Sequence, residues 1–224
     1  MRELIKNIVA LEWEMFHNVN GEARTECQNE QATFELMRNA QFDTWNDETL
    51  ASYLEDLKAA VANGKSLIRE KYIHMMKNTD KDGYEAFKQE LPEITEAKQK
   101  LVDDIWTLLL AQTEKFREKY PLLALGGRPL HASEEQDWPS VETYQKGELL
   151  TYSENTLKLL LDHIKKLDAE GVSIAYKIQE NSVTCLGYKT MDEAEFAMAN
   201  QFMQEMGIEI GPSECPSCKI DAEI

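Results

Sequence analysis

Arg38 and Gln41 are polar residues on what is otherwise an apolar helix face. When residues 33–45 are wound at the helical period, both residues fall on one stripe. The rest of that stripe is formed by Phe34, Met37, Phe42 and Trp45. Burying a guanidinium group without a partner costs several kcal/mol. We therefore expect Arg38 to meet an acid, a ligand or water, and the stripe is the first indication of a pocket.

Glu12 is the natural partner for this arginine. It lies near the middle of the apolar face of a helix predicted over residues 4–19. The other members of that face are Ile5, Ile8, Val9, Met15, Phe16 and Val19. A carboxylate in such surroundings suits an ion pair with Arg38. The pair could be a structural salt bridge or part of a binding site, and the sequence leaves both open.

Further polar side chains fall on the apolar faces of two later helices. Tyr144, Glu148 and Tyr152 follow Val141 at spacings of three and four residues, and Asn181 shares a stripe with apolar residues of its own helix. Buried polar groups must be satisfied, and this set exceeds what a helical bundle needs for cohesion. We predict that the set lines a polar ligand cavity; separate structural networks are the alternative.

These residue types suit general acid–base chemistry on a small anionic metabolite. We assign the catalytic roles to Glu12, Glu148 and Tyr144. We assign substrate binding to Arg38, Gln41, Arg128, Tyr152 and Asn181. The two glutamates could instead hold a divalent cation, as carboxylates from different helices of a bundle do. No sequence feature decides between these readings, and none indicates a cofactor.

The cysteines leave three interpretations open. Cys215 and Cys218 have the spacing of a metal or redox pair. A zinc site of four cysteines would also need Cys27 and Cys185, which are isolated in the sequence. A metal site, a redox dithiol and an incidental tail motif therefore all remain possible readings.

Two pairs of glutamate and histidine are expected on the solvent side of their helices. Glu14 and His17 match one element of the di-iron carboxylate bundles, but such a site needs two of these elements and the chain has no second copy. Glu70 and His74 are also spaced for a surface pair. We expect surface pairs here rather than ligand sets.

The elements that carry these residues are helices, because no segment alternates as a strand would. We predict a single-domain, all-α bundle of about eight helices over residues 1–206, followed by a tail at 207–224. Loops are expected at 80–83 and 122–139, and the second is of a length that is usually functional. Helices are expected over residues 4–19, 29–45, 46–64, 67–76, 93–119, 140–151, 154–169, 173–186 and 191–206.

Composition and charge restrict the class of protein. The 224 residues are 42% hydrophobic and 29% charged, which is typical of a globular chain. Forty-one acidic residues against 24 basic ones give a net charge of −17, which would repel nucleic acid and anionic membranes. Charged residues interrupt the apolar amino-terminal stretch, so we expect neither a signal peptide nor a membrane span. We expect a cytoplasmic protein with a small-molecule partner, and self-association stays open.

Short motifs over most of the chain share one resemblance. They are Leu11-Glu12-Trp13-Glu14-Met15-Phe16, Cys27-Gln28, Thr33-Phe34, Met37-Arg38, Gln41-Phe42, Glu70-Lys71-Tyr72, Met75-Met76, Gly127-Arg128-Pro129, Thr143-Tyr144, Gly147-Glu148-Leu149, Tyr152-Ser153, Glu180-Asn181 and Gly187-Tyr188. Together they resemble an uncharacterised bacterial family, domain-of-unknown-function family 4125. The resemblance implies a single cytosolic domain and supplies no mechanism.

Two functions are consistent with the sequence. The first is an enzyme that acts on a small anionic metabolite in a polar pocket within the bundle. The second is a metal-binding or protein-interaction module without catalysis, which would use the acidic surface and the cysteine pair of the tail. Whether the protein is an enzyme therefore stays open at this point.

Overall fold

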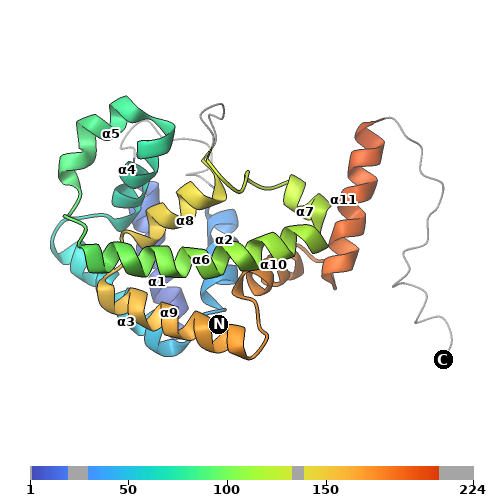
Figure 1. Cartoon of the computed structure of the whole chain (residues 1–224), viewed down its shortest axis with the longest axis horizontal. Coiled ribbons are helices and arrows are strands. Elements are labelled where there is room, and N and C mark those ends of the chain that lie inside the picture. The colour runs from blue at the N-terminus through green and yellow to red at the C-terminus, as the bar shows by residue number, and fades with distance from the viewer. Residues whose placement is uncertain (1, 20–29, 133–138, 207–224) are drawn as a thin grey trace.

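All regular structure in the described residues is helical (Figure 1). The computed structural model describes residues 2–19, 30–132 and 139–206. Within these ranges the predicted all-α bundle is confirmed, with eleven α-helices rather than about eight. They are α1 (Glu3–His17), α2 (Gln31–Phe42), α3 (Asp47–Ala62), α4 (Leu67–Thr79), α5 (Lys81–Phe87), α6 (Glu96–Lys119), α7 (Pro121–Leu125), α8 (Val141–Leu149), α9 (Glu154–Ala169), α10 (Ile174–Cys185) and α11 (Met191–Glu205).

Two short helices, α5 and α7, lie where loops were expected. Asp80 caps α5 by accepting a hydrogen bond from the backbone N–H of Gly83 at 2.9 Å. Pro121 opens α7, since its missing N–H suits a first helical turn. The next two N–H groups of α7 donate to the carboxylate of Glu195 on α11, each at 2.8 Å. Because this partner lies more than seventy residues further along the chain, the local sequence does not predict the helix.

Several predicted helix boundaries are confirmed. The side chain of Asn46 accepts the N–H of Thr49 at 2.9 Å, and that of Thr190 accepts the N–H of Glu193 at 3.1 Å. Gly64 follows α3 with φ of 66°, a conformation that glycine adopts at little cost. Local sequence thus determines where these helices begin and end.

The main core lies between two groups of helices. The longest helix, α6, packs against α7, α8, α9 and α10, while α1 packs against α2, α3 and α4. Further contacts join the groups, because α4 packs on α8, α3 on α9 and α2 on α10. Figure 1 shows α6 running across the bundle with α9 alongside it. The largest fully buried side chains include Tyr53, Tyr152, Phe42, Ile8 and Glu12.

A glycine brings α8 close to α4. A Cβ atom at Gly147 would lie 2.9 Å from Cγ of Met75 and 3.2 Å from the backbone oxygen of Lys71. The second atom belongs to the backbone and cannot swing aside, so a larger side chain would push the two helices apart. The residue after this glycine is Glu148, which therefore lies beside the first turns of α4.

The helix α11 stands at one end of the bundle and packs on α7 and α10 (Figure 1). A second, smaller core joins it to the rest, formed by Phe116, Tyr120, Val183, Met191 and Ala194. The predicted tail at 207–224 lies outside the described residues.

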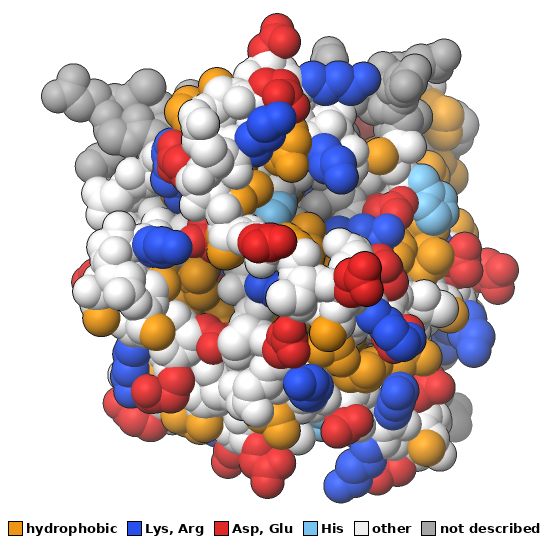
Figure 2. All heavy atoms as spheres, turned by 60° about the vertical axis from the view of Figure 1, so that its left-hand side comes forward, with side chains coloured by type: hydrophobic (Ala, Val, Ile, Leu, Met, Phe, Trp, Pro, Cys, Tyr) orange, Lys and Arg blue, Asp and Glu red, His pale blue; other side chains and the backbone are white. Residues whose placement is uncertain are grey.

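The surface carries charges of both signs. Figure 2 shows Lys and Arg side chains lying among Asp and Glu side chains on one face, with apolar patches between them. In the described parts of the chain, every helix is too short or too polar to cross a bilayer.

Candidate functional site

The predicted pair between Glu12 and Arg38 is present and buried. Arg38 donates from Nε to Oε2 of Glu12 at 2.7 Å and from Nη2 to Oε1 at 2.6 Å. The side chains are 6% and 0% exposed, so water screens this pair hardly at all. Two parallel charge-assisted hydrogen bonds of this kind fix the guanidinium plane. The pair joins α1 to α2.

Glu148 meets the same guanidinium from α8. Its carboxylate accepts hydrogen bonds from Nη1 and Nη2 of Arg38 at 3.1 to 3.2 Å. It also accepts from Nζ of Lys71 at 2.6 Å, from the hydroxyl of Tyr152 at 2.6 Å and from the amide of Gln41 at 2.9 Å. Arg38 thus lies between two carboxylates supplied by different helices.

Two further contacts complete the network. The hydroxyl of Tyr53 donates to Oε1 of Glu12 at 2.6 Å, and Nη1 of Arg38 donates to Oε1 of Gln41 at 2.9 Å. The network therefore holds two carboxylates, one guanidinium and one ammonium group, which balance to zero net charge. We refer to Glu12, Arg38, Gln41, Tyr53, Lys71, Glu148 and Tyr152 as the buried ion network.

Electrostatics keep Glu148 ionised and Tyr152 neutral near pH 7. Burial opposes ionisation of Glu148, but the charges of Arg38 and Lys71 outweigh it and lower the pKa of that carboxyl well below its ordinary value. Burial raises the pKa of Tyr152, and the adjacent Glu148 raises it further. A carboxyl with a depressed pKa is a weak base, and a phenol with a raised pKa is a weak acid.

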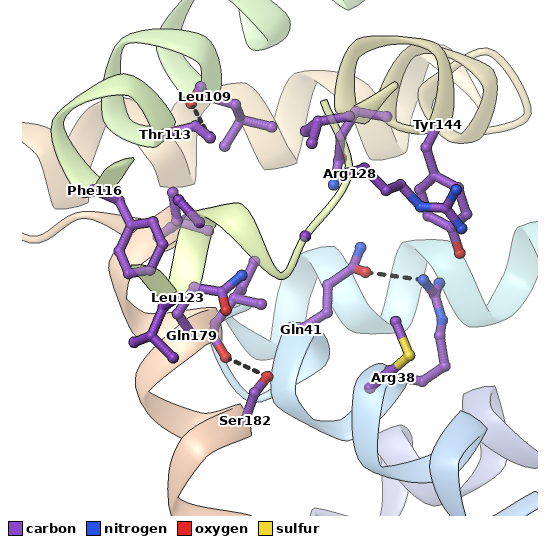
Figure 3. Close-up of a pocket in the computed structure, with 18 of the residues that line it drawn as sticks. Arg38, Gln41, Leu109, Thr113, Phe116, Leu123, Arg128, Tyr144, Gln179 and Ser182 are labelled. Carbon is purple, nitrogen blue, oxygen red and sulfur yellow. Dashed lines mark hydrogen bonds between the residues drawn. The ribbon is translucent and has the colours of Figure 1, made fainter. Parts of the chain in front are cut away.

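Beside the network lies a cavity of about 700 Å³ (Figure 3). It is bounded by α2, α6, α8, α9, α10 and the segment from α7 to residue 128. Its wall is largely apolar and includes Trp45, Trp106, Leu109, Leu160, Ile164 and Ile178. Cavities of this size commonly hold small organic ligands.

Five of the eight predicted site residues line the cavity. They are Arg38, Gln41, Arg128, Tyr144 and Tyr152. Figure 3 shows Arg38 beside Gln41, and Arg128 next to Tyr144. Their roles in binding or catalysis stay predictions.

The other three predicted residues do not line the cavity. Glu12 and Glu148 bind Arg38 within the protein interior. The amide of Asn181 donates to the backbone oxygen of Ala40 at 3.0 Å, which joins α10 to α2. A ligand bound in this cavity would therefore not contact these three side chains.

Two arginines at the cavity have no carboxylate partner among the described residues. Arg117, on α6, donates from Nη1 to the backbone oxygen of Arg128 at 3.1 Å. Arg128 donates from Nη1 to the backbone oxygen of Pro139 at 3.2 Å, and its guanidinium carbon lies 5.2 Å from the ring centre of Tyr144. The opposite charge that each would normally attract is thus missing from the described part of the chain.

Sequence reasoning missed Lys71 and Arg117. Lys71 lies four residues after Leu67 and four before Met75, both of which are buried, so its place on an apolar stripe was readable. Arg117 follows Phe116 near the end of the long helix, and nothing in the local pattern separates it from the other charged residues there. Only the packing of α6 against the segment around residue 128 brings it to the cavity.

The expected surface pair between Glu70 and His74 is wrong. Glu70 is only 8% exposed, and Nε2 of His74 is buried without a hydrogen-bond partner among the described residues. The reason is that α1, α5 and α8 all pack on α4, so this face of the helix is covered. Burial, with smaller effects from Lys98 and Lys77, lowers the pKa of His74 from 6.5 to about 4.

We predict that His74 makes the protein less stable in mild acid. The unfolded chain binds the proton near pH 6.5 and the folded chain only near 4, so stability is lost as pH falls between these values. The expected loss from pH 7 to about 5 is about 1–2 kcal/mol, allowing for partial exposure of the ring. Urea unfolding at both pH values measures it. His74→Leu should lose less stability over this interval, and an equal loss in both proteins would contradict the prediction.

The sequence left a metal site open as an alternative, and the described residues can be searched for one. Among them, no three His, Cys, Asp or Glu side chains are grouped so as to hold a metal ion. Cys185 is exposed on α10. Cys27, Cys215 and Cys218 lie outside the described residues, so the predicted cysteine site is not tested.

Comparison with known protein families identifies a match over most of the chain. The model of a family described as protein of unknown function, DUF4125, matches residues 2–196. No curated protein and no solved structure matches the chain. The matched region contains the whole buried ion network and the cavity, whereas Cys215 and Cys218 lie beyond it.

Proposed function

Since the chain belongs to the DUF4125 family, whose function is unknown, we propose a function from the site alone: the protein binds a small, largely apolar organic anion in its cavity. The observation that carries this proposal is the cavity of about 700 Å³, which has an apolar wall and also two arginines without a carboxylate partner in the described residues. The wall would bury the apolar part of the ligand, and the arginines would meet its charge.

The buried ion network has a different role in this proposal. Because every charge in it is already paired, it holds α1, α2, α4 and α8 together and presents Arg38 and Gln41 as a fixed part of the cavity wall. The sequence favoured Glu12 or Glu148 as a general base. We do not assign that role here, because neither side chain lines the cavity and the pKa of Glu148 is depressed.

A cavity-filling substitution tests the proposal. Ser182 lines the cavity, and its hydroxyl donates back to its own helix at 2.8 Å. We expect Ser182→Phe to weaken binding of decanoate at least about tenfold, which is about 1.4 kcal/mol, because the new ring occupies ligand space. Isothermal titration calorimetry with the full chain measures the affinity.

The same helix offers a matched control. Thr184 is exposed, lies two residues away and also donates its hydroxyl back to the helix at 2.8 Å, but it does not line the cavity. Thr184→Phe should bind decanoate as the unchanged protein does. Equal affinities for both variants would contradict the proposal, as would the failure of decanoate and anilinonaphthalene sulfonate to bind the unchanged protein.

A further inference from the structure

The arginines of the described chain divide into two groups. Three of the five form ion pairs: Arg2 with Asp47, Arg38 with Glu12 and Glu148, and Arg69 with Glu90. The other two, Arg117 and Arg128, have no carboxylate partner in the described residues, and both line the cavity. Both therefore have a positive charge that no described carboxylate neutralises and that an anionic ligand in the cavity can meet.

The two guanidinium groups are held in place and still have donors to offer. Arg117 is fixed by its bond to the backbone oxygen of Arg128. Arg128 is fixed by its bond to Pro139 and by the ring of Tyr144, whose centre also lies 3.5 Å from Nζ of Lys71. A guanidinium carries five N–H donors, and each of these two uses one on a backbone oxygen. The remaining donors form planar forks that suit the oxygens of a phosphate group.

Charge balance favours a dianion over a monoanion. Two unpaired guanidinium groups carry two positive charges, and a carboxylate would neutralise only one of them. A phosphate monoester carries a charge of about −1.5 to −2 near pH 7 and three acceptor oxygens. Trp106, Leu109 and Ile178 on the wall require that the rest of the ligand be apolar.

We propose that the ligand of this cavity is the phosphate monoester of an apolar alcohol, with its phosphate bound by Arg117 and Arg128. The proposal rests on the binding function given above and names the class of ligand for the same site. The phosphate lies near Gly127 and Tyr144, and the apolar chain extends along the wall formed by α6 and α10.

Three probes with one common chain test the proposal on the full-length protein: decyl phosphate, decanoate and decyl alcohol, each below its aggregation concentration. Near pH 8 we expect decyl phosphate to bind at least about tenfold tighter than decanoate, with decyl alcohol the weakest of the three. The advantage of the phosphate should shrink as pH falls to about 5.5, below its second pKa of about 6, because the phosphate then carries little more than one charge while decanoate is still mostly ionised. Calorimetric titration at both pH values provides the comparison.

Two variants and a control complete the test. Arg117→Gln and Arg128→Gln should each weaken decyl phosphate about tenfold and leave decyl alcohol unchanged, since only the phosphate needs the charges. Arg69→Gln, which removes an arginine paired with Glu90 away from the cavity, should change none of the three affinities.

The outcomes separate this proposal from the one it rests on. If decyl phosphate binds no tighter than decanoate, or if the variants weaken decyl alcohol equally, the phosphate assignment is overturned and the binding function stands. If none of the three probes binds, both fail together.

Discussion

Arg38→Ala should cost about 3–5 kcal/mol in the free energy of unfolding, which is a large part of the stability of a typical domain. The guanidinium lies between Glu12 and Glu148 and is 6% exposed in its side chain. Without it, two carboxylates remain in the interior, and Glu12 keeps only the hydroxyl of Tyr53 as a partner among the described contacts. The cost comes from the uncompensated charge rather than from the lost contact itself. Urea unfolding followed by circular dichroism measures it.

Two comparisons sharpen this result. Arg69→Ala removes an arginine from a half-exposed pair with Glu90 and should cost less than about 1 kcal/mol. Arg38→Leu combined with Glu12→Leu should be less destabilising than Arg38→Leu alone, because the double change also removes one of the stranded carboxylates. A loss below about 1 kcal/mol for Arg38→Ala would show that water reaches the network, contrary to its burial.

The position of Arg38 explains why the sequence pointed to this region and which feature of it the sequence could not show. Polar residues on apolar stripes indicated correctly that Glu12, Arg38 and Glu148 face the interior. The same pattern could not show that their charges cancel, because the balance depends on Lys71, which reaches Glu148 from a different helix. In this network every charge is paired, whereas Arg117 and Arg128 at the cavity beside it have no carboxylate partner in the described residues.

Much of the fold was readable because helix signals are local. Apolar periodicity gave the long helices, and the capping residues Asn46 and Thr190 and the glycine at 64 marked their boundaries. The short helix α7 was missed because the carboxylate of Glu195, more than seventy residues further along, satisfies its first N–H groups. Helices of five to seven residues show too little periodicity to be recognised by pattern alone.

The cavity itself could not be read from the sequence. Its wall combines residues of six helices, and which of them meet depends on how the helices cross. Asn181 illustrates this limit, since it lies on the predicted stripe of α10 but donates to the backbone oxygen of Ala40 on α2 instead of facing the cavity. Periodicity gives the direction of a side chain and leaves its partner undetermined.

Acid should unfold the protein largely through Glu148. Burial opposes ionisation of this carboxyl, but Arg38 and Lys71 outweigh it and hold its folded pKa below the ordinary value. In the unfolded chain the carboxyl titrates near about 4.3, so the unfolded state takes up the proton first as pH falls. The stability that ionised Glu148 provides is therefore complete above about pH 5 and is lost progressively below it, by about 2–4 kcal/mol in total.

Glu148→Gln isolates this contribution. At pH 7 the variant should be less stable by about 3–5 kcal/mol, because the ammonium group of Lys71 loses its carboxylate partner. Its stability should then fall less steeply than that of the unchanged protein between about pH 5 and 3, since the titrating group is absent. Glu90→Gln removes an exposed carboxylate that pairs with Arg69 and should keep nearly the whole acid dependence. Equal slopes for Glu148→Gln and the unchanged protein would mean that Glu148 is not the carboxyl whose protonation opens the bundle, and that the acid sensitivity lies elsewhere.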